Sequence, residues 1–252
     1  MPVYPTECFV LKKRLIELAF IFAGLLAVSC ILWITDADRR LASFILGAEK
    51  VDPVGNKFWP AGRAFPWNLL YLCGPVPAFI LAGTALTGLI GGFFVPRLAR
   101  CRKKTLFVLL FIALGPGLVV NVLLKDQLGR ARPREVIEYG GDQPFTQFWQ
   151  TGNAGRNGSF PSGHAAIAFF VIAPWFVLRD EKKKPAVLFL VTGLSFGTLV
   201  GIARILQGGH FISDVIWSAG LVYLTGGLLA LALGFGREDS CCSSSGSMAE
   251  NT

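Results

Sequence analysis

The sequence predicts an all-α integral membrane protein, a bundle of six transmembrane helices. The first observation is composition: 53% of the 252 residues are hydrophobic and only 16% are charged, with a mean hydropathy of +0.55. Because soluble domains carry about 25% charged residues, a water-soluble enzyme is disfavoured, and so is a disordered chain. The second is a set of six uncharged windows. The third is the distribution of Lys and Arg. Although the net charge of +8 could suggest a nucleic-acid-binding protein, this distribution fits a membrane protein better.

Each uncharged window is long enough to cross a bilayer, which takes about 20 mainly apolar residues. Window 64–96 exceeds one span, and Pro75, Pro77 and Gly91-Gly92 predict a kinked helix that begins near Asn68. Six buried helices of a large soluble core are disfavoured, because the remaining polar residues could not cover such a core. The windows are 18–35, 64–96, 105–124, 157–178, 185–203 and 215–236.

A cleaved signal peptide is the alternative for the first window. It follows a basic stretch, and Ala27-Val28-Ser29-Cys30 faintly resembles a lipoprotein cleavage site. The apolar run continues through Ile34 without a small-x-small pattern, so we expect a retained span.

Basic residues indicate the orientation, since short cytoplasmic loops are rich in Lys and Arg. Segments 12–14, 96–104 and 179–184 carry such clusters, and six spans place all three on one side. We therefore expect both termini in the cytoplasm. The outward loops are then 36–67, 125–162 and 204–213.

We expect one membrane domain over residues 1–238 and a disordered Ser-rich tail over 239–252. No cysteine falls in an outward loop, so a disulfide framework is not indicated. The sequence contains no internal repeat, nucleotide fingerprint or Walker loop.

The two histidines of the chain, His164 and His210, both lie at the outward end of an apolar window. A lone histidine is more often structural, but two at one membrane face in polar settings favour function. If the last helix begins near 210, Asp214 shares a face with His210 one turn away. The carboxylate then holds one ring nitrogen protonated and leaves the other as a nucleophile or base. The alternatives are a helix N-terminal acid, which leaves His210 unexplained, and a zinc site, which lacks further ligands.

A predicted helix start precedes His164. Ser and Pro favour such starts, and free N–H groups near Ser162 and Gly163 form an anion site. Plain capping is the alternative, but it does not require a histidine immediately after the cap.

A cation cluster runs from Lys125 to Arg134. If it continues the third helix, Lys125 and Arg132 lie two turns apart on one face, and Pro133 helps to end the helix. Lipid anchoring is the alternative, but an outward position opposes the usual charge bias and favours a specific anion. Arg204 adds a guanidinium group, which suits phosphate. Together with the histidines and Asp214, this set suits phosphoryl transfer through a phosphohistidine.

These residues resemble the type-2 phosphatidic acid phosphatase superfamily, in its membrane branch. The family pattern is Lys-x6-Arg-Pro, then Pro-Ser-Gly-His, then Ser-Arg-x5-His-x3-Asp. Three motifs in this order and spacing cover about residues 105–236, with Ala203 in place of the usual Ser. The matching positions are Lys125 with Arg132-Pro133, Pro161 through His164, and Arg204 with His210 and Asp214.

The resemblance implies a lipid phosphatase without a cofactor. His210 would attack phosphorus, Asp214 would orient it, and His164 would protonate the leaving oxygen. No metal would be needed, since cations and N–H groups meet the developing charge. Water would then release phosphate from His210. The phosphate oxygens would be held by Lys125, Arg132, Arg204, Ser162 and the N–H of Gly163.

The expected substrate is a lipid phosphate, because the site lies at the membrane–water boundary. Phe145, Phe148 and Trp149 suit an interfacial loop, and the long segment 134–160 is expected to cover a bulky head group. Bacterial family members act on lipid A, undecaprenyl diphosphate or phosphatidylglycerol phosphate. The stretch 65–77 most resembles the lipid A phosphatases, which implies a bacterial inner membrane and a periplasmic site. The expected partners are this lipid and the membrane, without nucleic acid.

Three alternatives stay open. An enzyme that transfers phosphate to another lipid would have the same sequence features. A transporter would use His, Asp and Arg as an ion pathway, usually near mid-membrane and with inverted repeats. A lipid-binding protein without turnover would not need both histidines.

Overall fold

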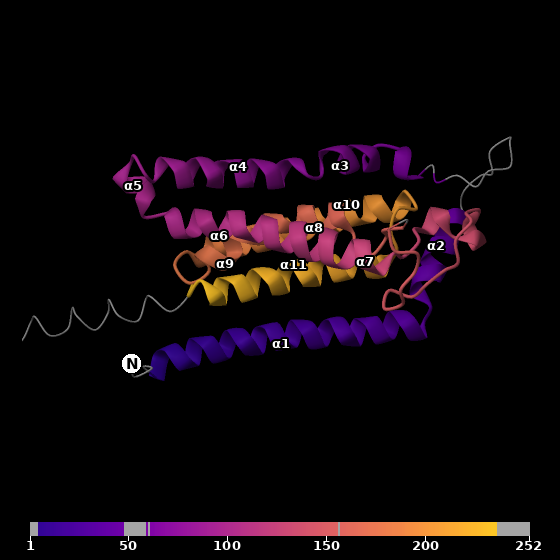
Figure 1. Cartoon of the computed structure of the whole chain (residues 1–252), viewed down its shortest axis with the longest axis horizontal. Helices are drawn as coiled ribbons and strands as arrows, with labels where there is room; N and C mark the ends of the chain where they lie inside the picture. Colours follow the sequence, from indigo (N-terminus) through magenta and orange to yellow (C-terminus); the bar gives the residue numbers. More distant parts are fainter. Residues whose placement is uncertain (1–4, 48–58, 60, 156, 236–252) are drawn as a thin grey trace, which may run out of the picture.

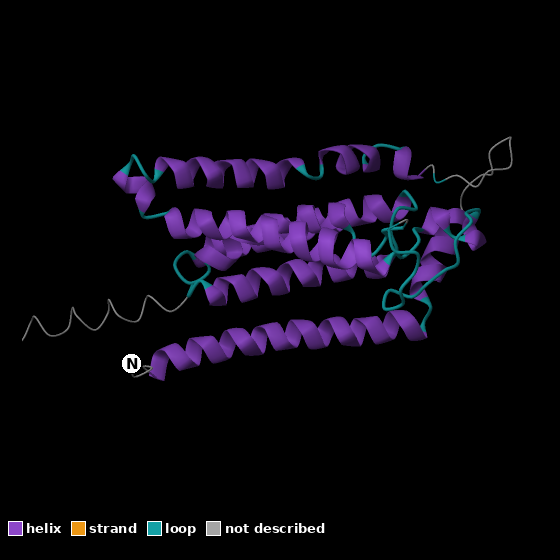
Figure 2. Ribbon diagram, viewed as in Figure 1, coloured by secondary structure: helices purple, strands orange, loops and turns teal. Residues whose placement is uncertain are grey.

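The computed structural model describes residues 5–47, 59, 61–155 and 157–235, with no side-chain description for 5–9 and 126. This part of the chain is helical and forms no β-strand (Figure 2), which confirms the all-α prediction for it. The predicted tail 239–252 lies outside the described residues. The α-helices are α1 (Pro5–Ile34), α2 (Ala37–Gly47), α3 (Trp67–Cys73), α4 (Val76–Gly91), α5 (Pro96–Ala99), α6 (Arg102–Ile112), α7 (Asp126–Leu128), α8 (Gly163–Phe169), α9 (Ala173–Leu178), α10 (Lys183–Leu206) and α11 (Ile212–Ala232). A π-helix (Ala113–Lys125) joins α6 to α7, and 3₁₀ turns occupy Ala61–Arg63, Pro133–Glu135, Ile137–Tyr139 and Phe170–Ile172.

Five helical segments of the described chain are long and apolar enough to cross a membrane. They correspond to five of the six predicted windows. The remaining window forms the shorter apolar stretch Gly163–Leu178, in which α8 and α9 flank a 3₁₀ turn. The sixth crossing therefore stays a prediction. The five segments are Val10–Ile34, Trp67–Gly91, Arg102–Lys125, Lys183–Leu206 and Ile212–Ala232.

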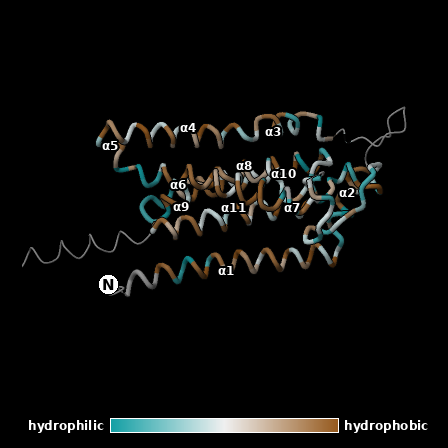
Figure 3. Tube along the Cα trace, in the orientation of Figure 1, coloured by the Kyte–Doolittle hydropathy of each residue, from teal (hydrophilic) through white to brown (hydrophobic). Residues whose placement is uncertain are grey.

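The long helices run side by side along the longest axis of the molecule (Figure 1). α8 packs against α10 and α11 at the centre, α1 packs on α11, and α3 packs on α10. Buried rings from α6, the 3₁₀ turn and α9 fill the core at Phe107, Phe111, Phe170 and Phe176. Hydrophobic residues dominate the helix bodies, and polar residues gather at the ends (Figure 3), as expected for helices that face lipid.

The three basic segments meet at one end of the bundle, near the start of α1, α5 and the turn between α9 and α10 (Figure 1). Ion pairs join them, so they share one side as the sequence predicts. The cytoplasmic placement of that side stays a prediction. The pairs are Arg14–Asp180, Glu17–Arg179 at 2.7 Å and Lys104–Glu181 at 2.5 Å.

Two of the membrane segments are interrupted by proline. The predicted kink in the second one lies at Gly74-Pro75, between α3 and α4. In the next segment, Pro116 has no N–H to donate, and the backbone widens into the π-helix. The Asn121 side chain donates to the Pro116 carbonyl at 2.6 Å, within the π-helix.

The third helix does not continue to Arg132, so that prediction is wrong. It ends at Leu128, where Gly129 takes the left-handed conformation with φ of +57°. A side chain at 129 would collide with the backbone of Ala154, so only glycine permits this turn. Arg132 is instead in extended conformation, before the 3₁₀ turn Pro133–Glu135.

A small second core lies at the opposite end from the basic segments. Ala42 and Ile45 of α2 belong to it, together with Trp59, Tyr139 and Phe211. This core holds α2 against the loops that carry the sequence motifs.

Candidate active site

His210 lies in the loop between α10 and α11, with its side chain only 3% exposed. α11 begins at Ile212, so His210 precedes the helix instead of lying within it. Its Nδ1 atom is 2.6 Å from the Ser159 carbonyl oxygen and 3.5 Å from Asp214 Oδ2. Because a carbonyl oxygen can only accept, Nδ1 carries the proton, and the neutral ring keeps its lone pair on Nε2.

The charge state of His210 follows from its surroundings. Burial lowers its pKa below the ordinary 6.5, and the nearby positive charges of Arg204 and Lys125 act in the same direction. The hydrogen bond and the charge of Asp214 oppose this shift. The net direction is downward, so the neutral ring is favoured at neutral pH.

Asp214 lies in the first turn of α11 and is fully buried. Its Oδ2 atom accepts hydrogen bonds from Ser159 Oγ at 2.6 Å and from the Phe211 N–H at 2.8 Å. Its Oδ1 atom accepts from Arg130 at 2.5 Å. The carboxylate is therefore held by several donors at the helix start, beside the His210 ring.

Arg130 is a fully buried cation beneath this pair. It donates to the Thr146 carbonyl at 2.9 Å and to Ser213 Oγ at 2.8 Å, in addition to Asp214. Its remaining terminal nitrogen pairs with Asp38 at 2.8 Å. A buried guanidinium between two carboxylates is electrostatically compensated, as a buried charge must be.

Asp38 reaches this network from α2, far from the sequence motifs. Besides Arg130, it accepts from the Ser213 backbone N–H at 3.0 Å and from Ser213 Oγ at 2.6 Å. The segment after α1 therefore supports the start of α11, and with it the position of Asp214.

The predicted helix start at Ser162 is confirmed. Ser162 caps α8, and its Oγ accepts from the Ala165 N–H at 3.4 Å. Gly163 is the first helical residue, and a Cβ there would lie 2.6 Å from Asn121 Oδ1, so glycine allows the close approach. His164 follows in the first turn of this helix and is half-buried.

The ring of His164 stacks on Tyr71 of α3, with centroids 4.9 Å apart. The guanidinium of Arg204 lies 4.6 Å from the centre of the same Tyr71 ring. Arg204 also donates to the Gln207 side chain at 2.5 Å. Tyr71 therefore contacts both His164, the predicted general acid, and Arg204, a predicted ligand of the phosphate.

The other predicted cations converge on the same region. The Lys125 side chain passes across Gly158, where a Cβ would lie 3.1 Å from Lys125 Cε. Lys125, Arg132 and Arg204 are all close enough to His164 to act on its charge. Arg132 also has Glu135 as a partner through its backbone N–H at 2.9 Å and its guanidinium at 3.4 Å. The structure thus brings together the catalytic and phosphate-binding candidates named from the sequence.

Residues 105–235 match the PAP2 superfamily. The chain belongs to this superfamily. The matched part includes the π-helix and every predicted site residue.

Curated relatives of this PAP2 protein are bacterial phosphatases. A lipid A 4'-phosphatase of Francisella tularensis subsp. novicida (strain U112) is 37% identical over 54% of this chain and 62% of its own length. A lipid A 4'-phosphatase of Rhizobium leguminosarum is 33% identical over 56% of this chain and 59% of its own length. Phosphatidylglycerophosphatase B of Bacillus subtilis (strain 168) is 28% identical over 48% of this chain and 56% of its own length. The chain thus spans roughly three fifths of the relatives it matches, and no solved structure matches it.

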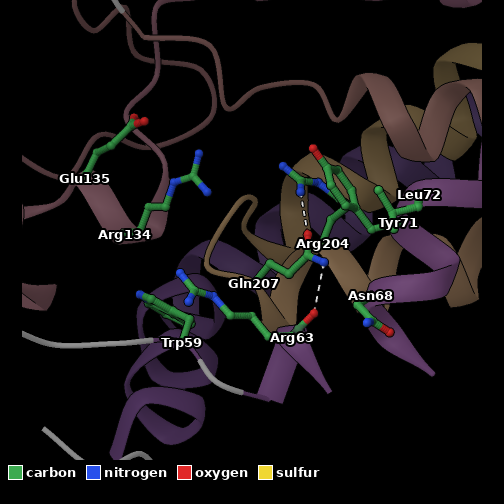
Figure 4. A pocket seen from close by; sticks show the side chains of 10 residues that line it. Trp59, Arg63, Asn68, Tyr71, Leu72, Arg134, Glu135, Arg204 and Gln207 are labelled. Atoms are coloured by element: carbon green, nitrogen blue, oxygen red, sulfur yellow. Dashed lines mark hydrogen bonds between the residues drawn. The ribbon is translucent and has the colours of Figure 1, made fainter. Parts of the chain in front are cut away.

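A pocket of about 740 Å³ opens beside Arg204 and Tyr71 of this PAP2 protein (Figure 4). No group of three or more His, Cys, Asp or Glu side chains that suits a metal ion occurs in the part of the chain that the structure describes. The residues that line the pocket are Trp59, Gly62, Arg63, Asn68, Tyr71, Leu72, Arg134, Glu135, Arg204 and Gln207.

Several members of this site could not be predicted from the sequence. Arg130 belongs to the cation cluster, and its position two residues before Arg132 gives no sign that it is buried. Asp38 and Tyr71 lie outside the matched region, and the Ser159 carbonyl is a backbone group. The available signal for Asp38 was the pair of acids, Asp36 and Asp38, directly after an apolar span.

Proposed function

We propose that this PAP2 protein is a membrane lipid phosphatase that acts through a phosphohistidine at His210. The substrate is a phosphomonoester or diphosphate of a lipid, with a lipid A-type phosphoglycolipid favoured. The observation that carries the proposal is the 2.6 Å contact between His210 Nδ1 and the Ser159 carbonyl. It keeps the proton on Nδ1 and leaves the Nε2 lone pair for attack on phosphorus.

In the first step, Nε2 forms a bond to phosphorus while the bond to the lipid oxygen breaks. His164 gives its proton to the leaving oxygen, and the lipid departs as an alcohol or a monophosphate. Lys125, Arg132 and Arg204 offset the negative charge on the phosphate oxygens, together with the N–H groups at the start of α8. These groups supply the positive charge that other phosphatases take from a metal, so the reaction needs none.

In the second step, water attacks the phosphorus of the phosphohistidine. His164, now deprotonated, accepts a proton from this water. The bond from Nε2 to phosphorus breaks, and inorganic phosphate leaves. Asp214 and the Ser159 carbonyl hold the His210 ring in position through both steps.

The lipid A-type substrate rests on the relatives, two of which are named lipid A 4'-phosphatases. The site lies at the bundle end opposite the basic segments, which supports a position on the periplasmic side of the inner membrane. The alternatives are an undecaprenyl diphosphate or phosphatidylglycerol phosphate phosphatase, and transfer of the phosphate to another lipid.

The test is phosphate release by the purified protein in detergent from a panel of lipid phosphates. The panel contains a phosphorylated acyl-disaccharide, undecaprenyl diphosphate, phosphatidylglycerol phosphate and phosphatidate. We expect the highest kcat/KM on the disaccharide and no release by His210→Ala. Release from none of the four would contradict phosphatase activity and favour the transporter alternative. Release that requires a second lipid as acceptor would indicate a transferase.

A further inference from the structure

The pocket beside Arg204 carries an excess of positive charge. Among the described residues that line it, Arg63, Arg134 and Arg204 come from three separate segments, and Glu135 is the one carboxylate (Figure 4). Glu135 is also a partner of Arg132. Like charges gathered at a partly desolvated site repel one another, and Arg132 and Arg134 both act in this way on Arg204. An anionic ligand would remove this repulsion.

Two residues in the wall of the same pocket each have a buried donor without an acceptor. Trp59 is 7% exposed, and its indole N–H has no hydrogen-bond partner in the described structure. The Nε–H of Arg204 also has no hydrogen-bond partner, although the NH1 group of the same side chain donates to Gln207. Buried polar groups are nearly always hydrogen-bonded, so these donors favour a ligand that offers oxygen acceptors.

The pocket shares Arg204 with the candidate active site and adjoins it through Tyr71. Tyr71 forms part of its wall and stacks on His164. Arg204 lines the pocket and is one of the proposed ligands of the reacting phosphate. A head group whose phosphate lies at His210 can therefore extend past Tyr71 toward Arg63 and Arg134. The volume of about 740 Å³ falls in the range of small-ligand pockets, roughly 300–1,000 Å³, and leaves room for a bulky head group.

We propose that this pocket is a second anion subsite, in which Arg63 and Arg134 bind a further phosphate on the head group of the same lipid. This inference rests on the proposed phosphatase function and narrows its substrate class to lipids with two separate phosphates. The aromatic rings of Trp59 and Tyr71 suit a sugar between the two phosphates, since they combine an apolar face with a polar group. The substrate class is thus an acylated sugar phosphorylated at two positions.

The experiment compares two synthetic acyl-disaccharides that differ only in a second phosphate. Initial rates of phosphate release give kcat/KM for wild type, Arg63→Gln, Arg134→Gln and the double variant in neutral detergent. Arg40→Gln is the matched control, because Arg40 is an exposed arginine of α2 that does not line the pocket. Mass spectrometry of the first product shows which phosphate is removed, so release from either position is counted.

Wild type should prefer the two-phosphate lipid. A hydrogen bond to a charged group contributes about 1.5–3 kcal/mol, which corresponds to about a ten- to hundredfold change. The Arg63 and Arg134 variants should lower this preference by that factor, chiefly through KM, while Arg40→Gln keeps it. Equal losses on both lipids would overturn the subsite while the phosphatase function stands. No release from either lipid by wild type would instead contradict the phosphatase function.

A membrane phospholipid could supply the same anionic chemistry. The rates on the one-phosphate lipid are therefore repeated in vesicles with and without phosphatidylglycerol. We expect Arg63→Gln to lower kcat/KM only for the lipid that carries the second phosphate, whatever the phosphatidylglycerol content. An effect that follows phosphatidylglycerol content and ignores the second phosphate would overturn the proposal.

Discussion

Replacement of Asp38 by alanine should destabilise the protein and displace its candidate catalytic pair. The change removes a 2.8 Å ion pair with Arg130 and two hydrogen bonds from Ser213, all of them buried. Breaking a buried ion pair by removing one partner costs about 3–5 kcal/mol, because the other charge stays buried. For a chain of this size, that corresponds to an unfolding temperature lower by roughly 10 °C. Asp38→Asn keeps the shape and one acceptor, so it should lose less.

The assay is thermal unfolding of the purified protein in detergent, with phosphate release measured well below the transition. Glu138→Ala is the matched control, because Glu138 is 47% exposed and pairs with Arg39 at 3.4 Å. Exposed pairs contribute about 0–1 kcal/mol, so this variant should unfold close to the wild-type temperature. An Asp38→Ala protein as stable as Glu138→Ala would refute the assigned importance of the Asp38–Arg130 pair.

The remaining predictions concern the chemistry. His164→Asn should slow hydrolysis of lipid phosphates by about a hundred- to ten-thousandfold, and should slow an aryl phosphate with a good leaving group much less; equal losses on both substrates would point to a binding role for His164. Burial lowers the pKa of His210 from 6.5, so its neutral, nucleophilic form persists to lower pH, and the acidic limb of log(kcat/KM) should have its midpoint below 6.5. An acidic limb with its midpoint at or above 6.5, which no substitution of another residue removes, would count against His210 as the titrating group. Activity should survive EDTA, and vanadate should inhibit as a phosphate mimic; loss with EDTA that one divalent ion restores would show a metal requirement.

The sequence predicted the parts of the site that depend on short spacing. His210 and Asp214 lie four residues apart, and Ser162 caps the helix that carries His164, so local geometry brings each set together. The spans were predictable because a hydrocarbon core demands long apolar helices. Even here the detail differs, since the closest partner of His210 is the Ser159 carbonyl, 51 residues away in the chain.

The other parts depend on tertiary packing. Asp38 and Arg130 are 92 residues apart, and no local pattern indicates that α2 folds back onto the motif loops. The end of the third helix at Leu128 depends on a left-handed Gly129 packed against the segment around Ala154. A helix pattern that continues past 128 carries no sign of that contact, which explains why Arg132 was wrongly placed on the helix.

The central claim is a covalent phosphoryl group on His210, and its most direct test is trapping of that intermediate. Purified protein is mixed with a lipid labelled in the reacting phosphate, quenched in alkali within one turnover, and analysed by peptide mass spectrometry. The account predicts a base-stable, acid-labile phosphoryl group on the peptide that contains His210, formed fast enough to support turnover and absent from His210→Ala. Label on another residue, or steady turnover by His210→Ala, would contradict it.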